Sequence, residues 1–150
     1  MRVTTWAEYG LIAAVHLARR AGEGPLSARE LAELERLPPD YVEQILLRLR
    51  RAGLVTSVRG ARGGYSLSRA PETITVRDVI AASELGTFEV NCDVHPVSPE
   101  RCAPTARCSI RPVWRALQQR IDTLLESITL DDLTHDEPEL AQLVGLVGAS

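Results

Sequence analysis

The chain has 150 residues, of which 45% are hydrophobic and 25% charged, with a net charge of −3; this is the composition of an ordinary soluble globular domain. No apolar run is long enough to span a bilayer, and the opening residues lead straight into an amphipathic stretch instead of a secretory signal, so we expect a cytoplasmic protein without a membrane partner. The three cysteines are an odd number, which argues against a disulfide framework.

The charge is distributed unevenly along the chain. Residues 1–70 contain 11 Arg and 7 acidic residues, whereas residues 71–150 contain 6 Arg and 13 acidic residues. All 17 basic residues are Arg. The first half of the chain is therefore the better candidate for meeting the phosphates of a nucleic acid.

Helices are predicted for the first third of the chain. Residues 5–20 are amphipathic and end before the breaker sequence GEGP. A second helix is expected from Ser27 to about Leu34, because Ser27 and Glu30 have the spacing of a capping box, and Leu26 with Leu31 has the spacing of a hydrophobic staple. Two prolines then favour the start of another helix.

A third helix is predicted over residues 40–55, followed by a β-hairpin. One side of this helix is apolar at the spacings i, i+3, i+4 and i+7, which indicates a buried face. That face consists of Val42, Ile45, Leu46 and Leu49. Gly53 stands where a left-handed helix cap is wanted. Residues 55–58 and 65–67 have strand character around a glycine-rich tip, which predicts the hairpin.

The second half of the chain combines helices with one long irregular stretch. Thr75 and Asp78 predict the cap of a short helix over residues 76–84. Residues 86–109 have no period and contain all three cysteines, and so long a loop in a compact domain is usually functional. A long amphipathic helix follows over residues 111–127. Thr129 with Asp132 resembles a further helix start, and the last residues form a tail that frays.

Three helices followed by a β-hairpin is the order of a winged helix-turn-helix, so the predicted fold is mainly α with a small β-hairpin wing. The second helix of such a pair enters the major groove, where Gln pairs with adenine and Glu accepts from cytosine. The residues expected at base edges are Asp40, Tyr41, Glu43 and Gln44. Those expected at phosphates, or in the minor groove at the wing tip, are Arg48, Arg50, Arg51, Arg59 and Arg62. Helical triads also occur in enzymes and in protein-binding modules, which remain alternatives at this point.

The cysteines follow the pattern C-x9-C-x5-C, at Cys92, Cys102 and Cys108. Thiolates are soft ligands that favour zinc, copper(I) or iron–sulfur clusters. Structural zinc sites use tighter pairs of cysteines, whereas a loop with wide spacings can wrap a larger cluster, which takes four protein ligands. The alternative is three unrelated thiols in an ordinary loop. The fourth ligand could be His95 in the loop, Glu8 on the first helix or an exogenous group, although Glu8 also has capping-box spacing to Thr5.

Several segments, chiefly YVEQILLRLRRAGLV and VRGARGGY, resemble the winged-helix iron–sulfur transcription regulators that include IscR and the nitric-oxide sensor NsrR. The opening MRVTTWAEYGL and the run VWRALQQRIDTLLESITLDDL are also similar, so the resemblance covers about residues 1–135. It implies that Cys92, Cys102 and Cys108 hold an iron–sulfur cluster, preferably 2Fe–2S with 4Fe–4S as the alternative. The histidine that IscR-like proteins have three residues after the last cysteine is Arg111 here, and Glu8 matches the helix-1 acid that some relatives recruit from the partner subunit instead.

The resemblance further implies a homodimer that crosses its long helices. The residues expected at that contact are Val113, Leu117, Ile121, Leu124 and Ile128. We therefore divide the chain into a winged helix-turn-helix domain at 1–84, a cysteine loop at 85–109, a dimerisation helix and C-terminal segment at 110–135 and a tail at 136–150.

These observations predict a repressor that binds a double-stranded DNA operator and senses iron–sulfur status, redox state or nitric oxide. The alternatives are a regulator without a cluster, acting by thiol oxidation or through a partner, and a zinc-stabilised interaction module. An enzyme is not expected, because the chain has no nucleophile–base set and GARGG fits no nucleotide-binding pattern.

Overall fold

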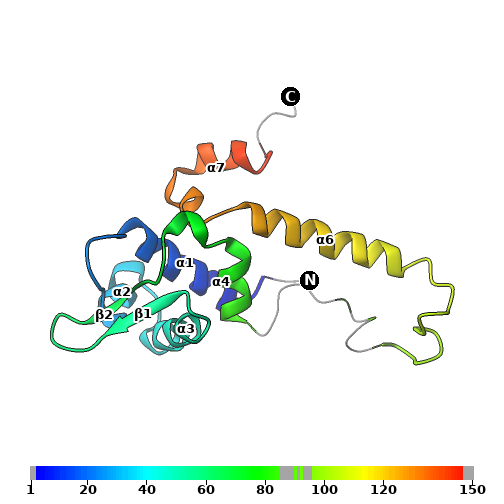
Figure 1. Ribbon diagram of the computed structural model, residues 1–150, viewed down its shortest axis with the longest axis horizontal. Coiled ribbons are helices and arrows are strands. Elements are labelled where there is room, and N and C mark those ends of the chain that lie inside the picture. The colour runs from blue at the N-terminus through cyan, green and yellow to red at the C-terminus, as the bar shows by residue number, and fades with distance from the viewer. Residues whose placement is uncertain (1–2, 85–89, 91, 93–95, 147–150) are drawn as a thin grey trace.

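The computed structural model describes residues 3–84, 90, 92 and 96–146. Its elements, in chain order, are α1 (Thr5–Arg19), α2 (Ala28–Glu35), α3 (Pro39–Arg51), β1 (Val55–Val58), β2 (Gly64–Leu67), η1 (Pro71–Thr73), α4 (Val76–Ser83), α6 (Arg111–Ser127), η2 (Asp132–Thr134) and α7 (Glu137–Leu143). Helices α1 to α4 form a body from which the β-hairpin projects on one side and α6 on the other (Figure 1). The predicted winged helix, mainly α with a two-stranded hairpin, is confirmed.

The core lies where α1, α2, α3 and α4 meet. The predicted apolar side of α3 is buried there, with Ile45, Leu46 and Leu49 fully inaccessible to solvent. Burying a side chain of this size contributes about 1.5–3 kcal/mol. Because this side of α3 is buried in the core, the orientation of the helix about its own axis is fixed, and its polar side faces outward.

The hairpin is a small two-stranded sheet that is attached to the body through the residue Leu26, just before α2. Strands β1 and β2 pair antiparallel, from Val55 opposite Leu67 to Val58 opposite Gly64. Leu26 and Tyr65 exchange two backbone hydrogen bonds, of 2.9 and 2.7 Å, which fix the hairpin to the start of α2. Gly64 has a φ of +149°, and a Cβ there would lie 2.3 Å from the Leu26 carbonyl carbon. A side chain at this position would therefore separate the wing from the body.

Two predicted capping boxes are confirmed, at Ser27 with Glu30 and at Thr75 with Asp78. Helix α3 ends at Arg51, earlier than the predicted residue 55, because Gly53 takes a φ of +76° and turns the chain into β1. In the predicted tail, residues 137–143 form α7. Its N-cap, Asp136, accepts a hydrogen bond from the Glu139 amide, which stabilises a helix start.

Helix α6 is joined to the body only near its C-terminal end, in the part of the chain that the structure describes. The amide of Val76 donates to the carbonyl of Ile128, and that of Leu130 donates to Ile74, both at 2.8 Å. Arg77 of α4 pairs with Glu126 at 2.7 Å. No residue of α6 itself is buried, and its N-terminal end points away from the body (Figure 1). None of the described helices is long and apolar enough to cross a membrane.

Candidate functional site

Three of the polar side chains expected at base edges lie on the outer side of α3. Asp40, Glu43 and Gln44 are exposed near the start of the helix, opposite its buried face. Their acceptors and donors are therefore free to meet a groove, as the helix-turn-helix arrangement requires. The wing lies next to α2 and α3, and its tip holds the exposed Arg59 and Arg62 (Figure 1).

Tyr41 and Arg48, also expected to contact DNA, are engaged within the fold. The Tyr41 ring lies 5.0 Å from the Trp6 ring and meets Tyr9 edge-on at 5.7 Å. The Arg48 guanidinium lies 3.9 Å from the centre of the Trp6 ring and donates through Nη1 to the carbonyl of Ser83. Tyr41 nevertheless remains 41% exposed, and Arg50 and Arg51 are exposed as well. These contacts were not foreseen because the partners lie on α1 and α4, far away in sequence.

The three cysteines are free thiols, and all are partly exposed. Cys102 and Cys108 lie in the turns that precede α6, at the end of this helix that points away from the body (Figure 1). Among the described residues, no three Cys, His, Asp or Glu side chains come close enough to hold a metal ion. The structure thus places the thiols on one segment without assembling them into a centre.

Cys108 lies beside the N-terminal end of α6, which favours its thiolate. The backbone amides of Arg111 and Ile110 donate to the sulfur and lower the pKa of the Cys108 thiol, and the positive charge of Arg111 acts in the same direction. The guanidinium of Arg111 is turned elsewhere, and its Nη2 donates to the carbonyls of Cys102 and Ala103 at 3.0 and 2.9 Å. Arg111 therefore braces the turns between Cys102 and Cys108.

Glu8 is exposed on the first turns of α1, and no hydrogen bond or ion pair of its carboxylate occurs among the described residues. The capping box considered for Thr5 and Glu8 does not form. Instead Thr4 is the N-cap, and its hydroxyl accepts from the Ala7 amide at 3.2 Å. The capping explanation for Glu8 is therefore wrong, and its carboxylate stays available. His95 lies outside the described residues.

Most of the apolar stripe of α6 is exposed or only half-buried within the part of the chain that the structure describes. The exposed fractions of Val113 and Leu124 are 60% and 47%, and Leu117 and Ile121 are half-buried. Ile128 differs, because it lies just beyond α6 and is only 8% exposed against the body. The other four residues form a continuous apolar face at helical spacing.

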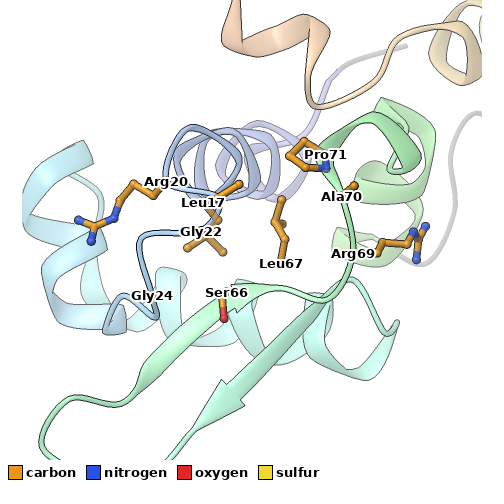
Figure 2. A pocket seen from close by; sticks show the side chains of 10 residues that line it. Leu17, Arg20, Gly22, Gly24, Ser66, Leu67, Arg69, Ala70 and Pro71 are labelled. Carbon is orange, nitrogen blue, oxygen red and sulfur yellow. The ribbon is translucent and has the colours of Figure 1, made fainter.

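A pocket of about 240 Å³ lies between the end of α1, the following loop and β2 (Figure 2). Leu17 and Leu67 face its interior, whereas Arg20 and Arg69 extend outward at opposite sides. Each of these arginines pairs with an acid at 3.5 Å, Glu23 and Asp78 respectively. The residues that line the pocket include no Cys, His, Asp or Glu that could bind a metal or act as a base beside Ser66, and we do not assign the functional site to it.

Comparison with known proteins identifies the family. Residues 3–136 match the Rrf2 family, described as iron-dependent transcriptional regulators. The chain is 36% identical over 133 residues to the regulator CymR of Bacillus subtilis, covering 89% of each protein. It is 35% identical to the regulator IscR of Erwinia tasmaniensis, covering 91% of this chain and 81% of that protein. The solved structure of T. potens IscR superposes with a TM-score of 0.71 at 35% identity, covering 100% of this chain and 93% of that one.

These relatives are transcriptional regulators and not enzymes, which agrees with the outward polar side of α3 and the arginine-tipped wing. The chain therefore belongs to the Rrf2 family and is a DNA-binding transcriptional regulator with a winged helix-turn-helix fold.

Proposed function

We propose that this protein is a cytoplasmic homodimeric repressor whose operator affinity depends on an iron–sulfur cluster bound by Cys92, Cys102 and Cys108. One observation carries the proposal: three free and partly exposed thiols lie on one segment, and the fold favours the thiolate form of the last one. Thiolate is the form in which cysteine binds iron. The family description as iron-dependent regulators and the similarity to IscR support the same chemistry.

The residues of this chain fit such a cluster in kind. Three thiolates are the ligands that iron–sulfur clusters prefer, and a carboxylate can complete the set. The guanidinium of Arg111 carries only N–H donors and no acceptor atom, so it cannot be a ligand. We therefore propose Glu8 of the partner subunit as the fourth ligand, because its carboxylate is exposed and without a partner among the described residues. When bound, the cluster would supply a redox-active and oxygen-labile link.

The ligand residues would connect two parts of the dimer. Cys102 and Cys108 lie at the far end of α6, whereas Glu8 lies on the body of the winged helix. A centre shared by these side chains would tie the cysteine segment of one subunit to α1 of the other. Loss of the shared centre would break this connection between the subunits, and the two recognition helices would then shift relative to each other. The two recognition helices must fit operator half-sites that lie about 34 Å apart, so a small rotation of one subunit against the other would change the affinity for DNA.

Dimerisation is proposed to bury the apolar face of α6, which consists of Val113, Leu117, Ile121 and Leu124. Val113 and Leu124 are exposed and Leu117 and Ile121 are only half-buried, and a contiguous apolar patch of this kind is typical of an interaction surface. Ile128 is left out of the contact, because it is buried against its own body.

The proposed DNA contacts follow the exposed polar groups. Asp40, Glu43 and Gln44 would meet base edges, and Arg50 and Arg51 would meet phosphates. Arg59 and Arg62 at the wing tip would enter the minor groove, where the potential is most negative. Arg48 is assigned to packing instead, because its guanidinium contacts Trp6 and Ser83, whereas Tyr41 packs against Trp6 but is exposed and stays among the proposed contacts.

A second function, a thiol switch without a cluster, is favoured by a specific observation. No three metal-ligand side chains gather among the described residues, while the pKa of the Cys108 thiol is lowered. A thiolate that is partly exposed is the species that peroxides and disulfides attack.

An absorbance spectrum with iron and acid-labile sulfide assays on protein purified without oxygen separates these functions. The cluster predicts visible absorption with iron and sulfide in equal amounts, lost in Cys102→Ala and kept in the control variant Ser109→Ala. Colourless protein that cannot be reconstituted would refute the cluster. Zinc without sulfide would indicate an interaction module instead. Selection from a random duplex library then identifies the operator, and loss of binding by the cluster-loaded form would contradict repression by that form.

A further inference from the structure

Arg48 differs from the other arginines of the recognition helix α3 in facing the body of the protein. Its guanidinium stacks over the Trp6 ring at 3.9 Å, a geometry in which a cation is attracted by the aromatic face. Its Nη1 donates to the carbonyl oxygen of Ser83 at 2.5 Å. Arg50 and Arg51 are exposed on the same helix. A single side chain of α3 thus contacts both α1 and the end of α4.

Ser83 and Glu84 are the last residues of the body before the cysteine segment begins. Ser83 is completely buried and ends α4, so its carbonyl is one that the helix itself cannot pair. Glu84 accepts a hydrogen bond of 2.6 Å from the hydroxyl of Thr4, the N-cap of α1. The point where the cysteine segment leaves the body is therefore held by two side chains, Thr4 at the N-cap of α1 and Arg48 of α3.

The attachment at Ser83 is tight. Gly10 of α1 lies directly against Ser83, and a Cβ at Gly10 would come within 2.0 Å of the Ser83 hydroxyl oxygen. Ser83 cannot move toward α1, so a displacement of the chain at Ser83 acts on the Arg48 guanidinium. Arg48 lies one helical turn after Gln44, and a single turn of α-helix is rigid on this scale. Movement at Ser83 would thereby reach the side chains proposed to read bases.

We propose that Arg48 is a positioning residue that couples the start of the cysteine segment to the recognition helix. This inference rests on the proposed DNA-binding function of α3, and it adds the route by which the segment controls that helix. In the arrangement described here, Arg48 holds the end of α4 and the outer side of α3 in one relative position. Coupling between two sites is reciprocal, so DNA bound to α3 must also stabilise the end of α4.

This reciprocity allows a test on the full-length protein without any metal. The amide of Glu84 donates to the carbonyl of Ile80 at 3.0 Å and closes the last turn of α4. Hydrogen exchange of this amide, measured by NMR with and without the duplex selected from the random library, reports the opening of that turn. In the wild type, DNA is expected to slow the exchange about fivefold or more, the lower end of usual coupling factors.

The decisive variant is Arg48→Lys. Lysine keeps the positive charge but cannot stack flat on Trp6 while donating to Ser83, so DNA should still bind and should change the Glu84 exchange less than about twofold. The control is Arg29→Lys, the same change at an exposed residue of α2, which should behave as the wild type. Exchange slowed equally in Arg48→Lys and the wild type would overturn the proposal, as would an absence of any effect of DNA on the wild type.

Two further results keep the test complete. If Arg48→Lys does not fold, Trp6→Leu removes the ring under the guanidinium and should weaken the effect of DNA on the Glu84 exchange. A full effect in that variant would refute the coupling.

In Arg48→Gln, the salt dependence of DNA binding should be unchanged, whereas a slope reduced by about 0.9 would show that Arg48 contacts a phosphate instead. Because no metal is present, failure of the cluster assay and failure of this proposal are distinguishable.

Discussion

Replacement of Gly10 by alanine tests the closest contact between helices in the body. The new Cβ would lie 2.0 Å from the Ser83 Oγ and 2.9 Å from the Ser83 Cβ. Rotation of the hydroxyl would relieve the first contact, at the cost of its hydrogen bond to the Val79 carbonyl. It would leave the second contact below 3.0 Å, so α4 would have to move away from α1.

The expected cost follows from these contacts. Overpacking costs about 1–3 kcal/mol and the lost hydrogen bond about 1 kcal/mol, while alanine gains about 1 kcal/mol in helix propensity. We expect Gly10→Ala to lower the free energy of unfolding by about 1–3 kcal/mol. In a chain of this size each kcal/mol corresponds to about 2–4 °C in Tm.

Urea and thermal unfolding followed by circular dichroism would measure this change. The double variant Gly10→Ala, Ser83→Gly removes both contacting atoms and leaves Val79 at an ordinary 3.7 Å, so it should be more stable than Gly10→Ala alone. The single variant Ser83→Gly is the control for the lost serine. Gly10→Ala as stable as the wild type, or a double variant no better than the single one, would refute the close approach of α1 and α4.

Three further predictions concern the wing, the long helix and the C-terminal helix. Arg59→Ala and Arg62→Ala should each reduce the salt slope of DNA binding by about 0.9, as seen by fluorescence anisotropy, if each guanidinium meets one phosphate. Ile121→Asp should give a folded monomer in sedimentation experiments, because Ile121 lies in the middle of the apolar face of α6 and is only half-buried within its own chain. Hydrogen bonding to Glu139 raises the pKa of His135. The stabilising contribution of this pair should therefore be present below pH 6.5 and be lost as the pH rises through the raised pKa. NMR titration of the His135 imidazole would measure this pKa, and a value below 6.5 would contradict the prediction.

The sequence predicted those parts of the fold that depend on neighbouring residues. The caps at Ser27 and Thr75 and the buried stripe of α3 follow from spacings within one or two helical turns, and local hydrogen bonds and burial act on the same scale. The contacts of Tyr41 and Arg48 within the fold could not be predicted in this way. Both are polar residues on a helix that also bears exposed arginines, and only the packing of Trp6 against α3 distinguishes them.

The sequence predicted which residues could form the metal site, but not how they are arranged. The sequence indicates three clustered thiols, but whether they converge depends on the path of the chain between the body and the far end of α6. Arg111 also has a role that spacing alone did not suggest, because the carbonyls it braces belong to residues eight and nine positions earlier.

The length of α6 separates the start of the cysteine segment from its end. Helix α6 has 17 residues and is therefore about 25 Å long, and it is attached to the body only near its C-terminal end among the described residues. The cysteine segment begins at the body, beside Ser83, and ends at the opposite end of this helix, beside Cys108. Ligands that draw the segment together would act on both ends, and a dimer holding α6 in place would direct the displacement to Ser83. The size of the resulting change in operator affinity is limited by how differently the ligands bind the two positions of the segment.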